Sequence, residues 1–248
     1  MSLRNVLRGI SYISNTLNGV GIRLYNDPSG NTLFRVKSRQ DLVITGTSKQ
    51  PIPEIGKMIG IANISYLSSL LSSKLYENCY IDVKQNENGE SEDLILKTSK
   101  SQVVYRLTSE EILKQIFEGK MISFEKVDYD VDVTVDEETI KDIQSQCAVS
   151  KNFDDSCIFV VEDGKFKMRV GDKSTNRFEY TIAENVKELS EDTHNIYYQL
   201  ETIRSMTSAI NALKPQKLKI MMLAKGLITF VFETEDFTMH VSKRGEVK

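Results

Sequence analysis

The sequence predicts an α+β fold made of two similar halves, each with two helices packed on antiparallel strands. Turn signals separate runs of strand-like composition, as in β-hairpins, at NDPSGN, NENGE, EDG and AKG. Stretches with the helical period alternate with these hairpins. The order helix, hairpin, further strand, helix, hairpin, final strand occurs twice, which indicates an internal duplication.

In the first half, a helix followed by a hairpin is expected twice. We expect its helices near 3–15 and 63–75 and its hairpin strands at 19–25, 32–37, 80–85 and 93–99. Asn63 stands directly before the second apolar period, where an amide oxygen can accept a hydrogen bond from a free helical N–H. Asn63 is therefore expected to cap the second helix.

The second half has the same plan. We expect its helices at 137–150 and 199–213 and its hairpin strands at 157–161, 165–170, 217–223 and 227–234, with Asp136 as a cap. The junction, TSEEILKQIFEGKMISFE, is not rich in Pro or Gly and carries apolar residues, so a short helix is expected there. The predicted organisation is an N-terminal domain at 1–107, a connector at 108–126 and a C-terminal domain at 127–248.

The stretch KVDYDVDVTVDEE raises the question of a metal site. Asp128, Asp130 and Asp132 alternate with apolar residues, so a strand would place all three on one face. A Ca²⁺ loop needs a Gly and a late Glu in register, and hydrolytic carboxylates converge from several elements. We interpret the row as the solvent face of a half-exposed strand.

Composition and motifs argue against an enzyme. The 248 residues are 40% hydrophobic and 27% charged with a net charge of −3, which fits a globular protein with a sizeable core. The two histidines are not near a nucleophile motif, and no phosphate-binding Gly-rich loop is present. We expect no cofactor and no metal. Three scattered cysteines and the lack of a signal peptide or membrane span predict a cytoplasmic protein, in the host cell if viral.

Charge is distributed unevenly between helices and strands. The first two predicted helices contain no Asp or Glu, the fourth contains only Glu201, and the third concentrates its acids in its first turn. Bases and hydroxyl groups on helices suit sequence-independent contact with phosphates, although chance alone also produces such a bias in short helices.

Several stretches resemble the sliding clamps of DNA polymerases. They are VTVDEETIKDIQSQCAVSKNFDDSCIFVVEDGKFKMRVGDK, KLKIMMLAKGLITFVFETEDFTMHV and NISYLSSLLS. The resemblance is strongest to clamps of T-even-type bacteriophages and more distant to proliferating cell nuclear antigen. It implies a homotrimeric ring whose helices surround double-stranded DNA, an ATPase clamp loader, and a DNA polymerase that inserts a peptide beneath the connector. The junction, however, is less proline-rich than the phage pattern.

The resemblance also implies three sets of site residues. The expected DNA channel bases are Arg4, Arg8, Lys141, Lys151, Arg204 and Lys214. The position of Lys214 on the helical wheel would direct its side chain toward the core. The expected subunit interface pairs Gln102, Val103, Tyr105 and Leu107 with Arg177, Phe178, Tyr180 and Ile182. The expected partner pocket comprises Val36, Leu42, Ile44, Ile116, Phe117, Leu227 and Met239. The alternatives are solvated bases for the first set and ordinary core packing for the other two.

Two other functions fit the same sequence. One is an interaction or virion structural protein with duplicated β-rich domains that forms no ring. The other, less favoured, is a metal-dependent nuclease that uses the Asp row.

Overall fold

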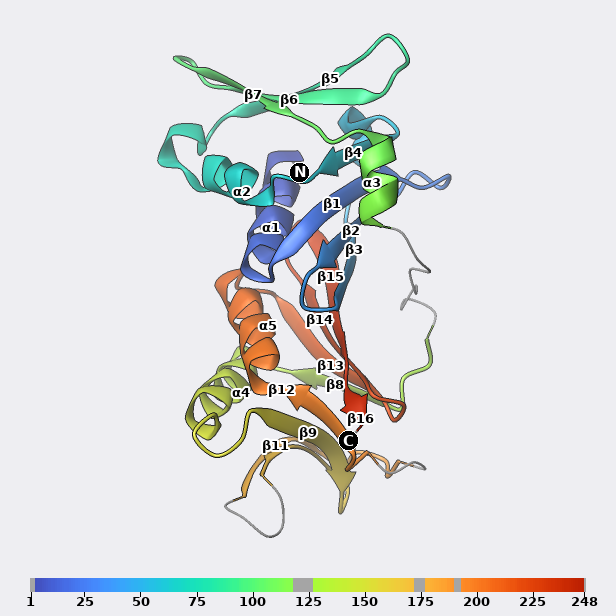
Figure 1. The fold of residues 1–248 in the computed structure, drawn as a ribbon, viewed down its shortest axis with the longest axis vertical. Helices are drawn as coiled ribbons and strands as arrows, with labels where there is room; N and C mark the ends of the chain where they lie inside the picture. The colour runs from blue at the N-terminus through green and yellow to red at the C-terminus, as the bar shows by residue number, and fades with distance from the viewer. Residues whose placement is uncertain (1–2, 118–126, 172–176, 190–192, 248) are drawn as a thin grey trace. The chain divides into compact units, whose positions relative to one another are not determined.

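A computed structural model describes residues 3–117, 127–171, 177–189 and 193–247. The chain forms two compact units (Figure 1). The first unit comprises Met1–Ile122 and Glu235–Met239, and the second comprises Ser123–Thr234 and His240–Lys248. Strand β15 (Phe237–Arg244) therefore contributes residues to both units.

The first unit packs two helices against antiparallel strands and carries a third, short helix near its junction. Its helices are α1 (Leu3–Thr16), α2 (Ile64–Ser72) and α3 (Glu110–Ile116). One group of strands has the order β4 (Met58–Ile61), β1 (Gly19–Asn26), β2 (Thr32–Ser38), β3 (Leu42–Ser48), followed by the first residues of β15. A three-stranded sheet has the order β5 (Tyr80–Gln85), β6 (Ser91–Lys97), β7 (Gln102–Arg106).

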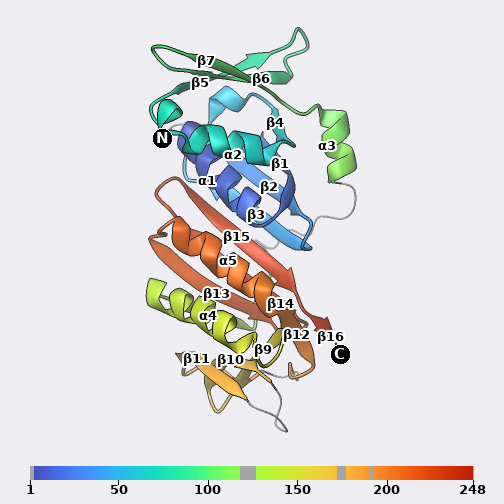
Figure 2. The same cartoon turned by 60° about the vertical axis from the view of Figure 1, so that its left-hand side comes forward.

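The second unit has the corresponding parts. Its helices are α4 (Glu137–Ser150) and α5 (Leu200–Ala212), which lie side by side (Figure 2). The later residues of β15 are followed by β14 (Leu227–Glu233), β13 (Lys217–Leu223) and β8 (Val131–Val135). A five-stranded sheet has the order β11 (Phe178–Glu184), β10 (Lys165–Val170), β9 (Ser156–Glu162), β12 (Ile196–Gln199), β16 (Glu246–Val247).

Each unit has its own hydrophobic core between helices and strands. In the first unit the apolar side chains of α1, such as Val6, Ile10 and Ile13, are fully buried. The Phe34 ring meets the Phe237 ring edge-on at 5.8 Å. Gly9 permits this packing, because a Cβ at that position would lie 2.5 Å from a Phe237 ring carbon. In the second unit the rings of Phe159 and Tyr198 pack edge-on at 5.4 Å. The duplicated α+β fold is confirmed.

The local predictions for helices and caps are confirmed as well. The Asn63 side chain accepts a hydrogen bond from the Tyr66 N–H at 3.4 Å, and Asp136 accepts one from the Thr139 N–H at 2.8 Å. The hydrogen bonds from the backbone N–H and the side-chain hydroxyl of Thr139 lower the pKa of Asp136, since they stabilise its charged form. All four predicted hairpins form, and the junction contains α3.

The Asp row faces solvent, although the strand is shorter than expected. Strand β8 begins at Val131, so Asp128 and Asp130 precede it. The Asp132 carboxylate pairs with the Lys219 ammonium at 3.1 Å, and Asp130 accepts a hydrogen bond from the Ala224 N–H at 2.8 Å. Within the described ranges, no group of three or more His, Cys, Asp or Glu residues is arranged to hold a metal. None of the helices described is long and apolar enough to span a membrane.

Candidate functional site

The solvent face of the first helix pair is polar and carries little charge. Arg8 and Asn15 of α1 are exposed, as are Ser65, Ser69 and Ser72 of α2. Among the described residues, no carboxylate forms an ion pair with Arg8, and α1 and α2 contain no acidic residue. This surface offers one positive charge and several hydroxyl groups to an anionic ligand.

Arg4 does not belong to that surface, which corrects the expectation for this residue. Its side chain is buried, and its Nε donates a hydrogen bond to the Tyr76 carbonyl at 3.0 Å. A longer contact of 3.4 Å joins Nη2 to the Leu71 carbonyl at the end of α2. Arg4 therefore satisfies backbone acceptors at a helix C-terminus, where a cation is also favoured by the helix dipole.

The second helix pair presents bases that share their surroundings with acids. Lys141 pairs with Glu137 at 2.5 Å, and both Lys151 (3.5 Å) and Arg204 (2.7 Å) pair with Glu201. The Arg204 hydrogen bond lowers the pKa of Glu201 and raises that of Arg204. All these side chains are exposed, so each pair contributes little to stability and opens readily.

Lys214 differs from its predicted orientation. It follows α5 with a positive φ of 47° and is exposed to solvent, whereas its helical angle predicted a direction toward the core. The chain leaves the helix before this residue, so the helical periodicity does not apply to it.

Two strands expected to form a subunit contact are edge strands. β7 ends the three-stranded sheet and β11 ends the five-stranded sheet. Each therefore has one side whose N–H and C=O groups lack a strand partner among the described residues, a natural template for pairing with another copy. On the β7 side, Gln102 is exposed and Val103 is half-buried.

Tyr105 and Leu107 are more enclosed than a surface contact requires. The Tyr105 hydroxyl donates to the Asn63 carbonyl at 2.9 Å, and burial raises the pKa of Tyr105 to about 12. Its ring stacks on Tyr66 with 5.9 Å between centroids, and Tyr66 is itself 46% exposed. Val104, on the opposite face of β7, is 54% exposed. Tyr105 and Leu107 thus belong largely to the core of the unit.

The β11 edge carries half-buried aromatic side chains and one exposed base. Arg177 is exposed, Phe178 and Tyr180 are half-buried, and Ile182 is 9% exposed. The Tyr180 hydroxyl donates to Asp142 of α4 at 3.0 Å. Val149 (60% exposed) and Phe153 (55% exposed) lie at the C-terminal end of that helix.

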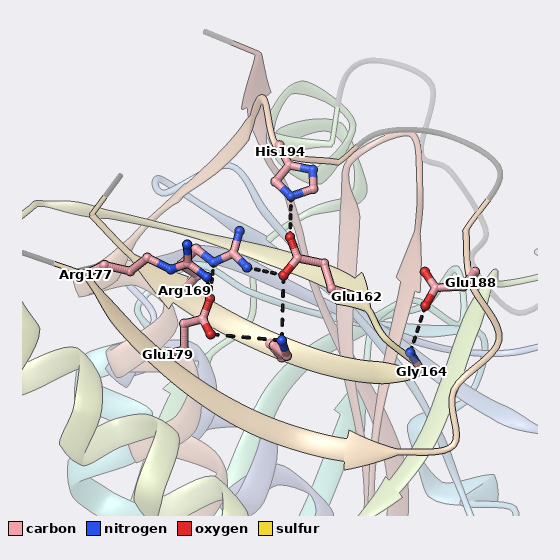
Figure 3. Close-up of polar contacts among 8 residues, drawn as sticks. Glu162, Gly164, Arg169, Arg177, Glu179, Glu188 and His194 are labelled. Atoms are coloured by element: carbon pink, nitrogen blue, oxygen red, sulfur yellow. Dashed lines mark hydrogen bonds and ion pairs between the residues drawn. The ribbon is translucent and has the colours of Figure 1, made fainter. Parts of the chain in front are cut away.

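An ion-pair network holds β11 against its neighbours (Figure 3). Arg169 is buried and bonds Glu179 of β11 at 2.7 Å, and it also pairs with Glu162 of β9. Glu162 accepts a second contact from the His194 ring at 2.7 Å. The Arg169 guanidinium is the main cause that lowers the pKa of Glu162 to about 2. The network fixes the position of β11, which is an edge strand among the described residues.

Comparisons with known proteins identify the fold. No protein family model matches the chain, and no curated protein matches it in sequence. Among solved structures, PCNA of A. fulgidus, in a structure titled "C-terminal region of FEN-1 bound to A. fulgidus PCNA", matches with a TM-score of 0.70 and 10% identity, covering 100% of this chain and 97% of that one. The chain has the sliding-clamp fold. PCNA from Thermococcus kodakaraensis matches with a TM-score of 0.66 and 10% identity, covering 99% and 98%.

The clamp fold places most of the expected pocket residues in the core. Val36, Leu42, Ile44 and Met239 are at most 2% exposed, which corrects the expectation that they form a partner surface. Strand alternation indicates which residues point inward, but an inward residue lines a pocket only where the helix layer leaves it open.

The connector residues and Leu227 remain candidates for a partner surface. Ile116 is half-buried and Phe117 is 8% exposed, and both pack over Gly21 of β1, where a Cβ would lie 2.9 Å from an Ile116 methyl carbon. Leu227, in the second unit, is half-buried.

Sequence reasoning missed four exposed apolar side chains, which lie on α2, on β7, in the last turn of α4 and in the turn after α4. Tyr66, Val104, Val149 and Phe153 are each at least 46% exposed. The sequence pattern could have revealed them, because a large apolar residue on the polar face of an amphipathic element is a candidate for a contact with a partner.

Proposed function

We propose that the chain is one subunit of a homotrimeric sliding clamp that encircles duplex DNA and tethers a DNA polymerase. The observation that carries this proposal is the match to PCNA over 100% of this chain with a TM-score of 0.70. In the proposed subunit, residues 108–126 connect clamp domains at 1–107 and 127–248. An ATPase clamp loader opens the ring, as the phage-type resemblance implies.

The DNA would lie against the two helix pairs. Arg8, Lys141, Lys151, Arg204 and Lys214 are exposed bases on or directly after these helices. Lys141, Lys151 and Arg204 already form ion pairs with carboxylates of the same helix pair. Each of them therefore adds only a weak, salt-screened attraction to phosphates. Weak contacts suit a ring that must move along DNA, because topology rather than affinity retains it.

The subunit contact would pair β7 of one copy with β11 of the next. Pairing would satisfy the open backbone groups of both edges. Val104 and Tyr66 would supply apolar surface on one side, and the half-buried Phe178 and Tyr180 of β11 on the other. The exposure of Tyr66 (46%) and Val104 (54%) beside the β7 edge supports such a contact.

The partner would be a peptide from a polymerase or another replication protein. The PCNA neighbour was solved with the C-terminal region of FEN-1 bound, which supports a short partner segment. The half-buried Ile116 and the buried Phe117 of the connector are the candidates to receive it.

Light scattering at micromolar concentration tests the assembly. We expect a mass three times that of the 28.2 kDa chain. Val104→Glu places a charge at the β7 edge and should give the monomer mass, whereas Val247→Glu, at a 79% exposed position on β16, should leave the trimer intact. A monomeric wild-type chain, with and without DNA, would contradict the proposal.

Retention on DNA tests the channel. Arg8→Ala combined with Arg204→Ala should shorten retention on a circular duplex without changing the trimer mass. Lys219→Ala, on a strand and paired with Asp132, is the matched control and should behave as wild type. Unchanged retention in the double variant would remove these bases from the DNA role.

A further inference from the structure

The two units build corresponding sheets from the strands that follow their second helices. Helix α5 is followed by β13, β14 and β15, and α2 is followed by β5, β6 and β7. In both sheets these three strands are neighbours in chain order. The two sheets can therefore be compared strand by strand, with β5 as the counterpart of β13.

The two counterpart strands differ at their outer edge. Strand β13 lies between β14 and β8, and β8 pairs with it in the antiparallel direction. Strand β5 pairs with β6 on one side, and no strand lies on its other side among the described residues. Every second N–H and C=O group of β5 points to that other side. In the described part of the chain, the first unit thus leaves open the edge that the second unit covers with β8.

Strand β8 shows which side chains suit such an edge. Its three valines face Leu218, Ile220 and Met222 across the pair, and these three partners are at most 4% exposed. Asp132 and Thr134 alternate with the valines and are exposed. An edge strand at this place therefore contributes β-branched apolar residues to the core side and polar residues to the solvent side.

The core side of β5 has the same pattern but is incompletely covered. Ile81 and Val83 face Leu96 and Leu94 of β6, which are fully buried. Ile81 itself is 7% exposed, and Val83 is half-buried. Tyr80, at the start of the strand, is 67% exposed. Apolar surface thus becomes accessible toward the open edge, where an added strand would cover it.

We propose that the outer edge of β5 takes up an extended segment of a partner protein as a fourth, antiparallel strand of this sheet. Backbone hydrogen bonds along the edge supply the affinity, and contact with Ile81 and Val83 selects a segment with β-branched apolar residues at alternate positions. The site goes beyond the proposed clamp function, since it requires neither a ring nor DNA. The subunit contact proposed above uses β7, at the opposite edge of the same sheet, so both edges can be occupied at once.

The surroundings favour a protein segment over the other possible occupants. The charges on the solvent side of β5 are already balanced, because Lys84 pairs with Glu92 at 3.5 Å and Asp82 with Lys97 at 3.6 Å. This edge therefore offers no basic track to a nucleic-acid strand. The β5 strand of a second copy would fit less well than a segment like β8, because its core side carries two apolar residues followed by the exposed polar Gln85.

Fluorescence anisotropy on the full chain tests the site. The probe is a fluorescein-labelled peptide in which three valines alternate with threonines between terminal lysines. Two further forms carry methyl groups on the backbone nitrogens of the valines or of the threonines, so each form loses the N–H donors of a single edge. One methylated form should bind as the parent does within about threefold, and the other at least about tenfold more weakly, because only one edge of the added strand faces β5.

Variants of the chain locate the bound peptide. Val83→Glu places a charge against the core side of the added strand and should weaken binding of the parent peptide at least about tenfold. Val104→Glu is the matched control on β7, since it adds the same charge to the opposite edge of the sheet. It should leave the affinity unchanged within about twofold, even though it breaks the proposed ring.

A second measurement needs no variant. The parent peptide should slow amide hydrogen exchange of residues 80–85 in the wild-type chain, measured by mass spectrometry, and leave residues 102–106 unchanged. Absence of binding, equal losses in both methylated forms, an unchanged affinity in Val83→Glu, or protection of 102–106 in place of 80–85 would overturn the proposal. An assembly larger than a trimer that Val83→Glu disrupts would identify a second copy as the occupant and would overturn it too. A monomeric chain that binds the parent peptide at β5 would refute the ring and leave this site standing.

Discussion

Replacing Arg4 with alanine should destabilise the first unit, whereas the same change at Arg8 should not. Arg4 is buried and donates to the Tyr76 carbonyl at 3.0 Å, and a hydrogen bond to a charged group contributes about 1.5–3 kcal/mol. The 3.4 Å contact with Leu71 adds little, but the substitution also leaves a buried carbonyl without a donor and removes the packed side-chain stem. We therefore expect Arg4→Ala to lower the free energy of unfolding by about 2–3 kcal/mol.

Urea unfolding followed by circular dichroism measures this difference, since the chain has no tryptophan. Arg8→Ala is the matched control: it removes an exposed arginine from the same helix and should change stability by less than about 0.5 kcal/mol. The variants must be compared at one protein concentration, because assembly would add a concentration-dependent term. Equal effects of the two substitutions, large or small, would refute the assignment of Arg4 as a buried backbone partner.

Three further perturbations probe the fold. Gly60→Ala puts a methyl group 2.4 Å from a Leu113 methyl carbon, so we expect α3 to shift and the chain to lose about 1–3 kcal/mol in urea unfolding. Tyr105→Phe should cost about 1 kcal/mol at pH 7. Because burial raises the Tyr105 pKa to about 12, its stability contribution should also decline above pH 10, where the unfolded chain ionises first; a flat alkaline profile for the wild type would contradict this. Since Arg169 lowers the Glu162 pKa to about 2, stability should fall as pH drops from about 4.5 toward 2, and Glu162→Gln should flatten that decline in an acid titration by circular dichroism.

Local patterns predicted the helices and hairpins because the physics behind them is local. The 3.6-residue period and the Gly- and Asn-containing turns depend on neighbours within a few positions. Asn63 and Asp136 cap their helices for the same reason, since the bonded N–H groups lie three residues ahead. The alternation of Asp128, Asp130 and Asp132 correctly predicted which face meets solvent. It did not predict that strand β8 begins only at Val131.

Surface assignments failed where a distant segment decides exposure. Arg4 and Arg8 lie one turn apart on α1, and only contact with the end of α2 and Tyr76 buries the first of them. Val36 and Met239 have the composition of a partner pocket, yet the helix layer covers them. Arg23 and Arg35 are direct neighbours only through the strand register, which local patterns do not supply.

The division of β15 between the two units affects the order in which the chain can fold. Residues 235–239 belong to the first unit, and the Lys49 N–H donates to the Asp236 carbonyl at 2.9 Å. Synthesis proceeds from the N-terminus, so these residues become available only after residues 123–234 of the second unit have been synthesised. Until then the first unit is incomplete, and the edge of β3 that pairs with β15 is exposed. A fragment that ends at residue 122 would expose this edge permanently and should aggregate rather than fold as an independent domain.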